Sequence, residues 1–147
     1  MAKTEIILGG GSLKRTLLWE RNSSYSSQEF PYTSGSESND VSLSDSIQNY
    51  DFIELLYRAS TNTSSAVSVI IPVNAFTQCG TAATDQRPKY AISGRDTALV
   101  SATLVRGVTY NDNTSITISN AFKMNSSGTD NRIAVPTKIY GLKGEIS

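Results

Sequence analysis

The stretch Asn49-Tyr-Asp-Phe-Ile-Glu-Leu-Leu-Tyr-Arg58 decides the fold prediction, because it reads as a strand with apolar groups on both faces. A strand places alternate residues on opposite faces. One face would carry Tyr50, Phe52 and Leu56. The other would carry Asp51, Ile53, Leu55 and Tyr57. The spacing of Phe52, Leu55 and Leu56 also fits a helix, but the β-branched and aromatic content favours a central strand of a sheet.

Similar alternation recurs through the rest of the chain, in which serine, threonine and asparagine dominate the polar positions. Further strands are expected at residues 13–19, 66–73, 89–93, 98–105, 107–110, 114–119, 132–135 and 137–140. About seven to nine short strands with no convincing helix predict a single-domain, all-β fold, an antiparallel β-sandwich of jelly-roll-like type. Its core is expected to contain Trp19, Phe52, Ile53, Leu55, Ile70 and Ile139.

The connections between these strands contain recognisable turn residues. Asn111-Asp-Asn113 separates two strands, and these residue types accept the left-handed conformations of hairpin turns. Gly94 opens another connection, since glycine tolerates positive φ. Pro72 cannot donate a ladder hydrogen bond, so it marks the end of a strand or a sheet edge. Two β-hairpins are therefore predicted, around Gly94 and around Asp112.

Residues 1–12 are expected to form an N-terminal arm, separate from the sandwich domain at residues 13–147. Residues 4–8 could make one strand, and Gly9-Gly-Gly-Ser12 would be a flexible joint. Such an arm could add a strand to the open sheet edge of a neighbouring subunit, because backbone hydrogen bonding needs no special side chains. A disordered terminus is the alternative.

Composition argues against several classes of partner. The 147 residues contain 13 basic and 13 acidic side chains, without a like-charged run that would bind nucleic acid or an anionic membrane. No segment has the apolar length of a membrane span, and the polar N-terminus does not resemble a secretory signal. Cys79 is the single cysteine, so it forms no intrachain disulfide and is expected to be a small buried residue.

Catalytic chemistry finds little support in the sequence. The absence of histidine removes Ser-His-Asp and Cys-His arrangements and histidine-containing zinc sites. The 13 carboxylates could supply a glycosidase pair, but no spacing selects two of them. Gly9-Gly-Gly-Ser12 lacks the second glycine and the context of a nucleophile elbow. We therefore expect no enzymatic activity and no cofactor.

Aromatic residues in the polar segment 20–40 form the first candidate recognition site. Tyr25 and Tyr32, with Phe30 between them, would offer rigid contact area on which a saccharide could stack. The alternative, favoured by the usual burial of aromatic groups, is that these rings cover the sandwich or a subunit contact.

The second candidate site is the turn formed by Tyr110, Asn111, Asp112 and Asn113. Its amide and carboxylate groups suit sugar hydroxyls, and the two loops are predicted to form a joint site. Oxygen ligands at this spacing could also bind calcium, although a plain hairpin turn is the simpler interpretation.

Four segments occur in a recognisable order: Leu17-Leu-Trp19, Leu43-Ser-Asp-Ser-Ile47, Tyr50-Asp-Phe-Ile53 and Lys138-Ile-Tyr-Gly-Leu-Lys143. This order resembles tailed-bacteriophage tail-fibre and attachment domains. In that family a Leu-Trp strand precedes a variable polar loop, and the domain finishes on a Lys-Ile-Tyr-Gly strand. The resemblance covers about residues 13 to 143, although residues 60–135 carry no motif that aligns.

The resemblance implies a non-enzymatic virion protein, assembled in the host cytoplasm, that serves as a tail-fibre or receptor-binding head for attachment to the host surface. Members of the family are commonly homotrimers, and threefold packing would bury an apolar side of each sandwich. The arm at residues 1–12 would contact other virion proteins, and the receptor would be a host-surface saccharide. The alternative is a capsid decoration protein, head fibre or tail-tip knob, which the short arm and the missing shaft favour.

Overall fold

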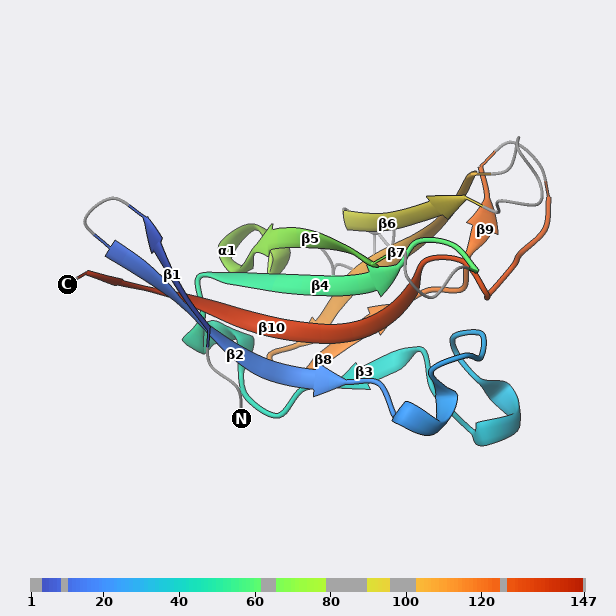
Figure 1. The fold of residues 1–147 in the computed structure, drawn as a ribbon, viewed down its shortest axis with the longest axis horizontal. Helices are drawn as coiled ribbons and strands as arrows, with labels where there is room; N and C mark the ends of the chain where they lie inside the picture. Colours follow the sequence, from blue (N-terminus) through green and yellow to red (C-terminus); the bar gives the residue numbers. More distant parts are fainter. Residues whose placement is uncertain are drawn as a thin grey trace.

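The computed structural model describes residues 4–8, 11–61, 66–78, 90–95, 103–124 and 127–146. Within these residues two antiparallel sheets pack together, which confirms the predicted β-sandwich (Figure 1). Three predictions fall outside the described residues: the burial of Cys79, the first part of the glycine joint and the start of the strand at 98–105.

The described strands form two sheets. Sheet A contains, in spatial order, β1 (Thr4–Leu8), β2 (Gly11–Glu20), β10 (Val135–Ile146), β4 (Phe52–Arg58) and β5 (Ala66–Pro72). Sheet B contains β3 (Asp40–Ser42), β8 (Ser115–Ile118), β7 (Thr103–Asp112) and β6 (Tyr90–Arg95), with β9 (Phe122–Lys123) paired to β7. This strand order establishes a sandwich but does not confirm a jelly-roll-like topology.

β4 is the central strand that the sequence predicts, with β10 on one side and β5 on the other. Ile53 and Leu55 point into the sandwich and are each 1% exposed. Leu55 lies opposite Ile139 of β10 and Val69 of β5. Because cross-strand partners share a face, this register places a row of apolar residues over sheet B. The predicted burial of Ile53, Leu55 and Ile139 is confirmed.

Two predicted core residues lie on the wrong side of sheet A for burial. Ile70 is 53% exposed, because it shares the outward row with Glu54. Phe52 alternates with the buried Ile53 and is only partly buried on the outer face. The prediction was wrong here because β4 and β5 have apolar residues on both faces, and the sequence alone does not show which face is covered by sheet B. Trp19 is partly buried and packs against the core.

A β-bulge in β2 determines which of its residues lies deepest. Tyr140 lies opposite Leu17 and Ile139 lies opposite Trp19, so Leu18 is the extra residue. Leu18 is 2% exposed and belongs to the core. A strict two-residue alternation, which makes Trp19 the core anchor, cannot anticipate this insertion.

The predicted hairpin of β7 and β8 is confirmed, with Asp112 opposite Ser115. Its turn does not use a left-handed residue: among the described non-glycine residues, positive φ occurs only at Ser36 and Ala134. The Asp112 carboxylate instead accepts hydrogen bonds from the amide and hydroxyl of Thr114, at 2.8 and 3.2 Å. An aspartate side chain therefore fixes this turn.

The strands β6 and β7 also pair as predicted, but Gly94 lies within β6 rather than in the connection. A Cβ atom on Gly94 would lie 1.7 Å from the carbonyl oxygen of Ala59. Close approach of two backbones, and not a turn, requires glycine at this position.

The strand predicted at residues 4–8 is present as β1, which pairs with β2 of the same chain. Gly11 and Ser12 belong to β2, so the predicted joint does not extend to them. In Figure 1, β1, the start of β2 and the end of β10 lie together at the end of the molecule that carries the C-terminus.

Helical structure in the described residues is limited to single turns. They are η1 (Ser23–Tyr25), η2 (Thr33–Gly35), η3 (Ile47–Asn49) and α1 (Val73–Phe76). α1 follows Pro72 and buries Phe76, which is 1% exposed. No helix in this part of the chain is long and apolar enough to cross a membrane.

Candidate functional site

The loop at residues 21–39, here named the anchored loop, joins β2 to β3 and is fixed from within by Arg21. The Arg21 guanidinium donates to the Glu37 carboxylate at 2.7 and 2.9 Å, and the two side chains are 3% and 11% exposed. It also donates to the carbonyls of Gln28 at 2.9 Å and Glu29 at 2.6 Å. This fork geometry suits arginine, which can bind a carboxylate and carbonyls at once.

Arg106 of β7 also contacts the anchored loop. Its fully buried guanidinium donates to four backbone carbonyls, those of Phe30 (2.7 Å), Asn131 (2.8 Å), Ser119 (2.9 Å) and Ile133 (3.0 Å). Burial, together with the nearby charge of Arg21, lowers the pKa of Arg106 to about 9. The side chain therefore remains a cation at pH 7 and joins three connecting segments.

Two further contacts complete this arrangement. The guanidinium groups of Arg21 and Arg106 lie 5.6 and 5.4 Å from the centre of the Phe30 ring. Arg58 of β4 donates to the Ser26 carbonyl at 2.9 Å, while its buried Nε has no partner among the described residues. Burial lowers the pKa of Arg58, and Arg21 contributes to the decrease. Three arginines thus fix the anchored loop.

Tyr25 and Tyr32, which the sequence proposes as receptor contacts, pack on each other and on the loop backbone. Their ring centres are 5.2 Å apart, and the rings are tilted by 55°. The Tyr25 hydroxyl donates to the Gly35 carbonyl at 2.8 Å. A Cβ atom on Gly35 would lie 2.7 Å from both rings. Both tyrosines are partly buried, which supports the alternative that the rings cover their own loop.

The second candidate group, Tyr110 to Asn113, is likewise engaged within the chain. The Tyr110 hydroxyl donates to the Asn113 side chain at 2.8 Å, and its ring packs edge-on against Phe76 at 5.9 Å. Asn111 donates to the Thr117 hydroxyl at 2.6 Å. With Asp112 bound to Thr114, the hairpin interpretation accounts for all four residues. The described residues contain no group of three or more potential metal ligands.

The two candidate groups lie at opposite ends of β3 and β8. The anchored loop ends at Asn39, whose side chain donates to the Ile118 carbonyl at 2.7 Å. At the other end of β8, Ser115 pairs with Ser42 and follows the turn at Asn113. Asn113 and Ile118 are five residue steps apart along the chain, which corresponds to roughly 16 Å of extended backbone. The structure therefore does not bring the two groups into the predicted joint site.

The segments that carry the family resemblance pack together in one corner of the sandwich. The Tyr50 hydroxyl donates to Asp45 at 2.8 Å, and this bond lowers the pKa of Asp45. The Tyr50 ring covers Gly141, where a Cβ atom would lie 2.5 Å from ring carbons. Asp51 accepts from the Gly144 amide at 2.7 Å. Asp45, Tyr50, Asp51 and Gly141, which belong to these segments, therefore have structural roles in this chain.

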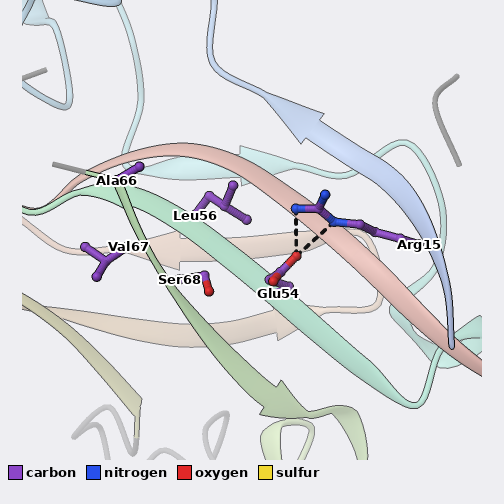
Figure 2. A pocket seen from close by; sticks show the side chains of 6 residues that line it. All are labelled: Arg15, Glu54, Leu56, Ala66, Val67 and Ser68. Atoms are coloured by element: carbon purple, nitrogen blue, oxygen red, sulfur yellow. Dashed lines mark hydrogen bonds and ion pairs between the residues drawn. The ribbon is translucent and has the colours of Figure 1, made fainter. Parts of the chain in front are cut away.

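The outer face of sheet A combines apolar and charged residues. By register it contains Arg15, Leu17, Phe52, Glu54, Leu56, Ser68, Ile70, Lys138 and Tyr140. A shallow hollow of about 240 Å³ lies on it, lined by Arg15, Glu54, Leu56, Ala66, Val67 and Ser68 (Figure 2). Arg15 donates to Glu54 at 2.9 Å and stacks 3.6 Å above the Tyr140 ring. The charges of Arg15 and Glu54 are paired with each other, so covering this hollow would leave neither of these two charges without a partner.

The outer face of sheet B has a different character. By register it contains Asp40, Ser42, Ala91, Ser93, Thr109, Asn111, Ser115 and Thr117. A polar ladder crosses it, because Thr117 donates to Asp40 at 2.5 Å while accepting from Asn111. Apolar groups also lie on this face, because Val105 of β7 pairs with Ser93 and with Phe122 of β9, which is 46% exposed. This difference between the outer faces was not predicted. The sequence does contain it, because the outward residues of β4 include Phe52 and Leu56, whereas those of β8 are Ser115 and Thr117.

Comparison of this chain with protein-family models, with curated proteins and with solved structures found no match.

Proposed function

We propose that this chain is a non-enzymatic structural protein of a tailed-phage virion and that it serves as a tail-fibre or receptor-binding head. The ordered resemblance of four segments carries the proposal. The packing of Tyr50 on Gly141 supports it, because two segments about 90 residues apart in sequence meet in one structural unit.

The anchored loop supports a role in surface recognition. A loop whose backbone is fixed by Arg21 and Arg106 can present its exposed side chains without a large ordering cost on binding. Its exposed positions are mostly hydroxyl and amide groups, such as Asn22, Ser24 and Thr33. Such groups suit a host-surface saccharide. A contact between the Tyr110–Asn113 turn and the saccharide would be made at the other end of β8.

The proposal includes a homotrimer located in the virion. Threefold packing through the outer face of sheet A would cover Phe52, Leu56 and Ile70, which one chain alone leaves partly or largely accessible. β1 lies at the edge of sheet A, so its free side is available to other virion proteins. Light scattering should then give a mass that is a multiple of three chains. A monomer at the highest soluble concentration would contradict the trimer.

A capsid decoration protein is the second candidate function. The observation that favours it is the internal packing of Tyr25 and Tyr32, which leaves those rings less available for a sugar. A decoration protein would use its apolar outer face to stabilise a particle and would need no receptor site.

Two binding assays with the purified protein separate the candidates. A receptor-binding head should adsorb to host cells, whereas a decoration protein should bind capsids that lack it and raise their resistance to heat. Tyr32→Phe removes one hydroxyl and keeps the ring packing, so it should weaken adsorption if the anchored loop binds the receptor. Ser93→Ala on the outer face of sheet B is the matched control and should leave adsorption unchanged. Adsorption to neither surface would overturn both functions.

A further inference from the structure

β5 is an edge strand with an exposed and uncharged sequence. Among the described residues it pairs only with β4, and Ala66-Val-Ser-Val-Ile-Ile-Pro72 contains no charge. Val67 and Ile70 are 42% and 53% exposed. Edge strands of soluble proteins usually carry lysine, a bulge or a covering segment that prevents pairing with another chain. β5 keeps a regular register along its whole length, and among the residues that the structure describes only Pro72, at its end, is such a device.

The direction of the free backbone groups on β5 follows from one hydrogen bond. The Val73 amide donates to the Asp51 carbonyl at 3.0 Å and continues the ladder with β4. Residues alternate in direction along an antiparallel strand, so Val67, Val69 and Ile71 also point their backbone groups toward β4. The N–H and C=O groups of the alternate residues, Ala66, Ser68 and Ile70, then point to the open edge. Pro72 falls on the same side, where its missing N–H breaks no bond with β4.

These free groups are self-complementary. Two antiparallel copies of β5, related by a two-fold axis at Ser68, would exchange about six backbone hydrogen bonds. Ser68 would then lie opposite its counterpart on the outer face, and β-branched residues would meet on the inner face. Identical neutral strands bring no like charges together, whereas an edge strand that carries charges would repel its own copy.

We propose that two copies of this chain associate edge to edge through β5 and so join their A sheets into one continuous sheet. This contact goes beyond the proposed virion function and does not depend on it. It involves the edge of sheet A, whereas the threefold association uses the outer face. The wild-type mass should therefore be an even number of chains, six if the trimer also forms and two if it does not.

Charge substitutions at Ser68 test the contact. Ser68 is exposed, so its replacement leaves the fold of one chain intact. In Ser68→Lys the two introduced ammonium groups would face each other across the axis, and the mass by sedimentation should fall by half. Ser68→Glu should behave in the same way. Ser68→Thr is the matched control, since it keeps the hydroxyl and introduces no charge, and should keep the wild-type mass.

Mixing the two charged variants gives the decisive result. An equimolar mixture of Ser68→Lys and Ser68→Glu should recover the wild-type mass, because opposite charges then meet at the axis. A wild-type mass that is an odd number of chains, a Ser68→Lys variant that keeps the wild-type mass, or a mixture that stays at half the mass would each overturn the proposal. The adsorption assays have a separate readout, so failure of the virion function leaves this result interpretable.

Discussion

The interior of the sandwich and the anchored loop are held together by different interactions. Between the sheets, residues such as Ile53 and Ile139 are buried against other apolar groups. In the anchored loop, Arg21 and Arg106 donate to backbone carbonyls that would otherwise be buried without partners. The comparison teaches that a polar segment can have a fixed shape without a core of its own. The arginines fix the course of the loop backbone through hydrogen bonds, and the two sheets support the loop.

Removal of the buried cation should have the largest effect. Arg106→Met leaves four carbonyls without their donor and should lower the free energy of unfolding by roughly 3–5 kcal/mol. Arg106→Lys keeps the charge but lacks the planar fork, so it should recover only part of this loss. Urea denaturation measures both. Arg132→Met, at a side chain that is 62% exposed, is the surface control and should cost less than about 1 kcal/mol.

Apolar truncation on the two faces of β4 should separate the interior from the outer face. Ile53→Ala should cost about 2–4 kcal/mol, because it opens a cavity between the sheets. Phe52→Ala, one residue away, should cost only about 1 kcal/mol in one chain, because its ring is partly solvated. Equal losses in equilibrium unfolding would show that the assignment of inner and outer faces is wrong.

Within the anchored loop, Glu37→Gln should have a moderate effect. The substitution keeps the shape of the side chain but removes the charge that pairs with Arg21, so the expected loss is about 1–2 kcal/mol. Amide hydrogen exchange should become faster in residues 28–37 and stay unchanged in β4. An unchanged loop would show that the carbonyl contacts of Arg21 suffice on their own.

The smallest expected effect is a pH dependence at the corner of the sandwich. The hydrogen bond from Tyr50 lowers the pKa of Asp45 in the folded protein. A carboxyl with a lowered folded pKa stabilises the fold above its unfolded pKa, and this contribution is lost as the pH falls through the folded value. The stabilities of wild type and Asp45→Asn should therefore differ at pH 6 and converge below pH 4. A constant difference across this range would contradict the role of the charge.

The sequence predicts much of the sheet structure. Alternation identifies β4, β5 and the β7–β8 hairpin, because a two-residue period and turn residues are local signals. Burial was harder to predict, since Phe52 and Ile53 are both apolar and only the position of sheet B decides between them. The bulge at Leu18 shifts the period by one residue and leaves no local sign.

The candidate site was predicted less well, for a physical reason. Tyr25 and Tyr32 were correctly assigned to one loop, but their contact with Gly35 depends on a fold of that loop which the sequence does not display. The separation of this loop from Tyr110 depends on the pairing of β3 with β8, which is a long-range contact. One signal was present: Arg106 lies between Leu104 and Val108 at an inward position, where a charge needs buried partners.

Location of the chain in an intact particle tests the central claim most directly. Under the proposed function, cryo-electron microscopy of the intact phage to which the chain is assigned should reveal the sandwich in a threefold group at the end of a tail fibre. The anchored loop should then be directed away from the particle. The same density on the capsid surface would select the decoration function instead. A complete particle that contains no copy of the chain would contradict its assignment as a virion protein.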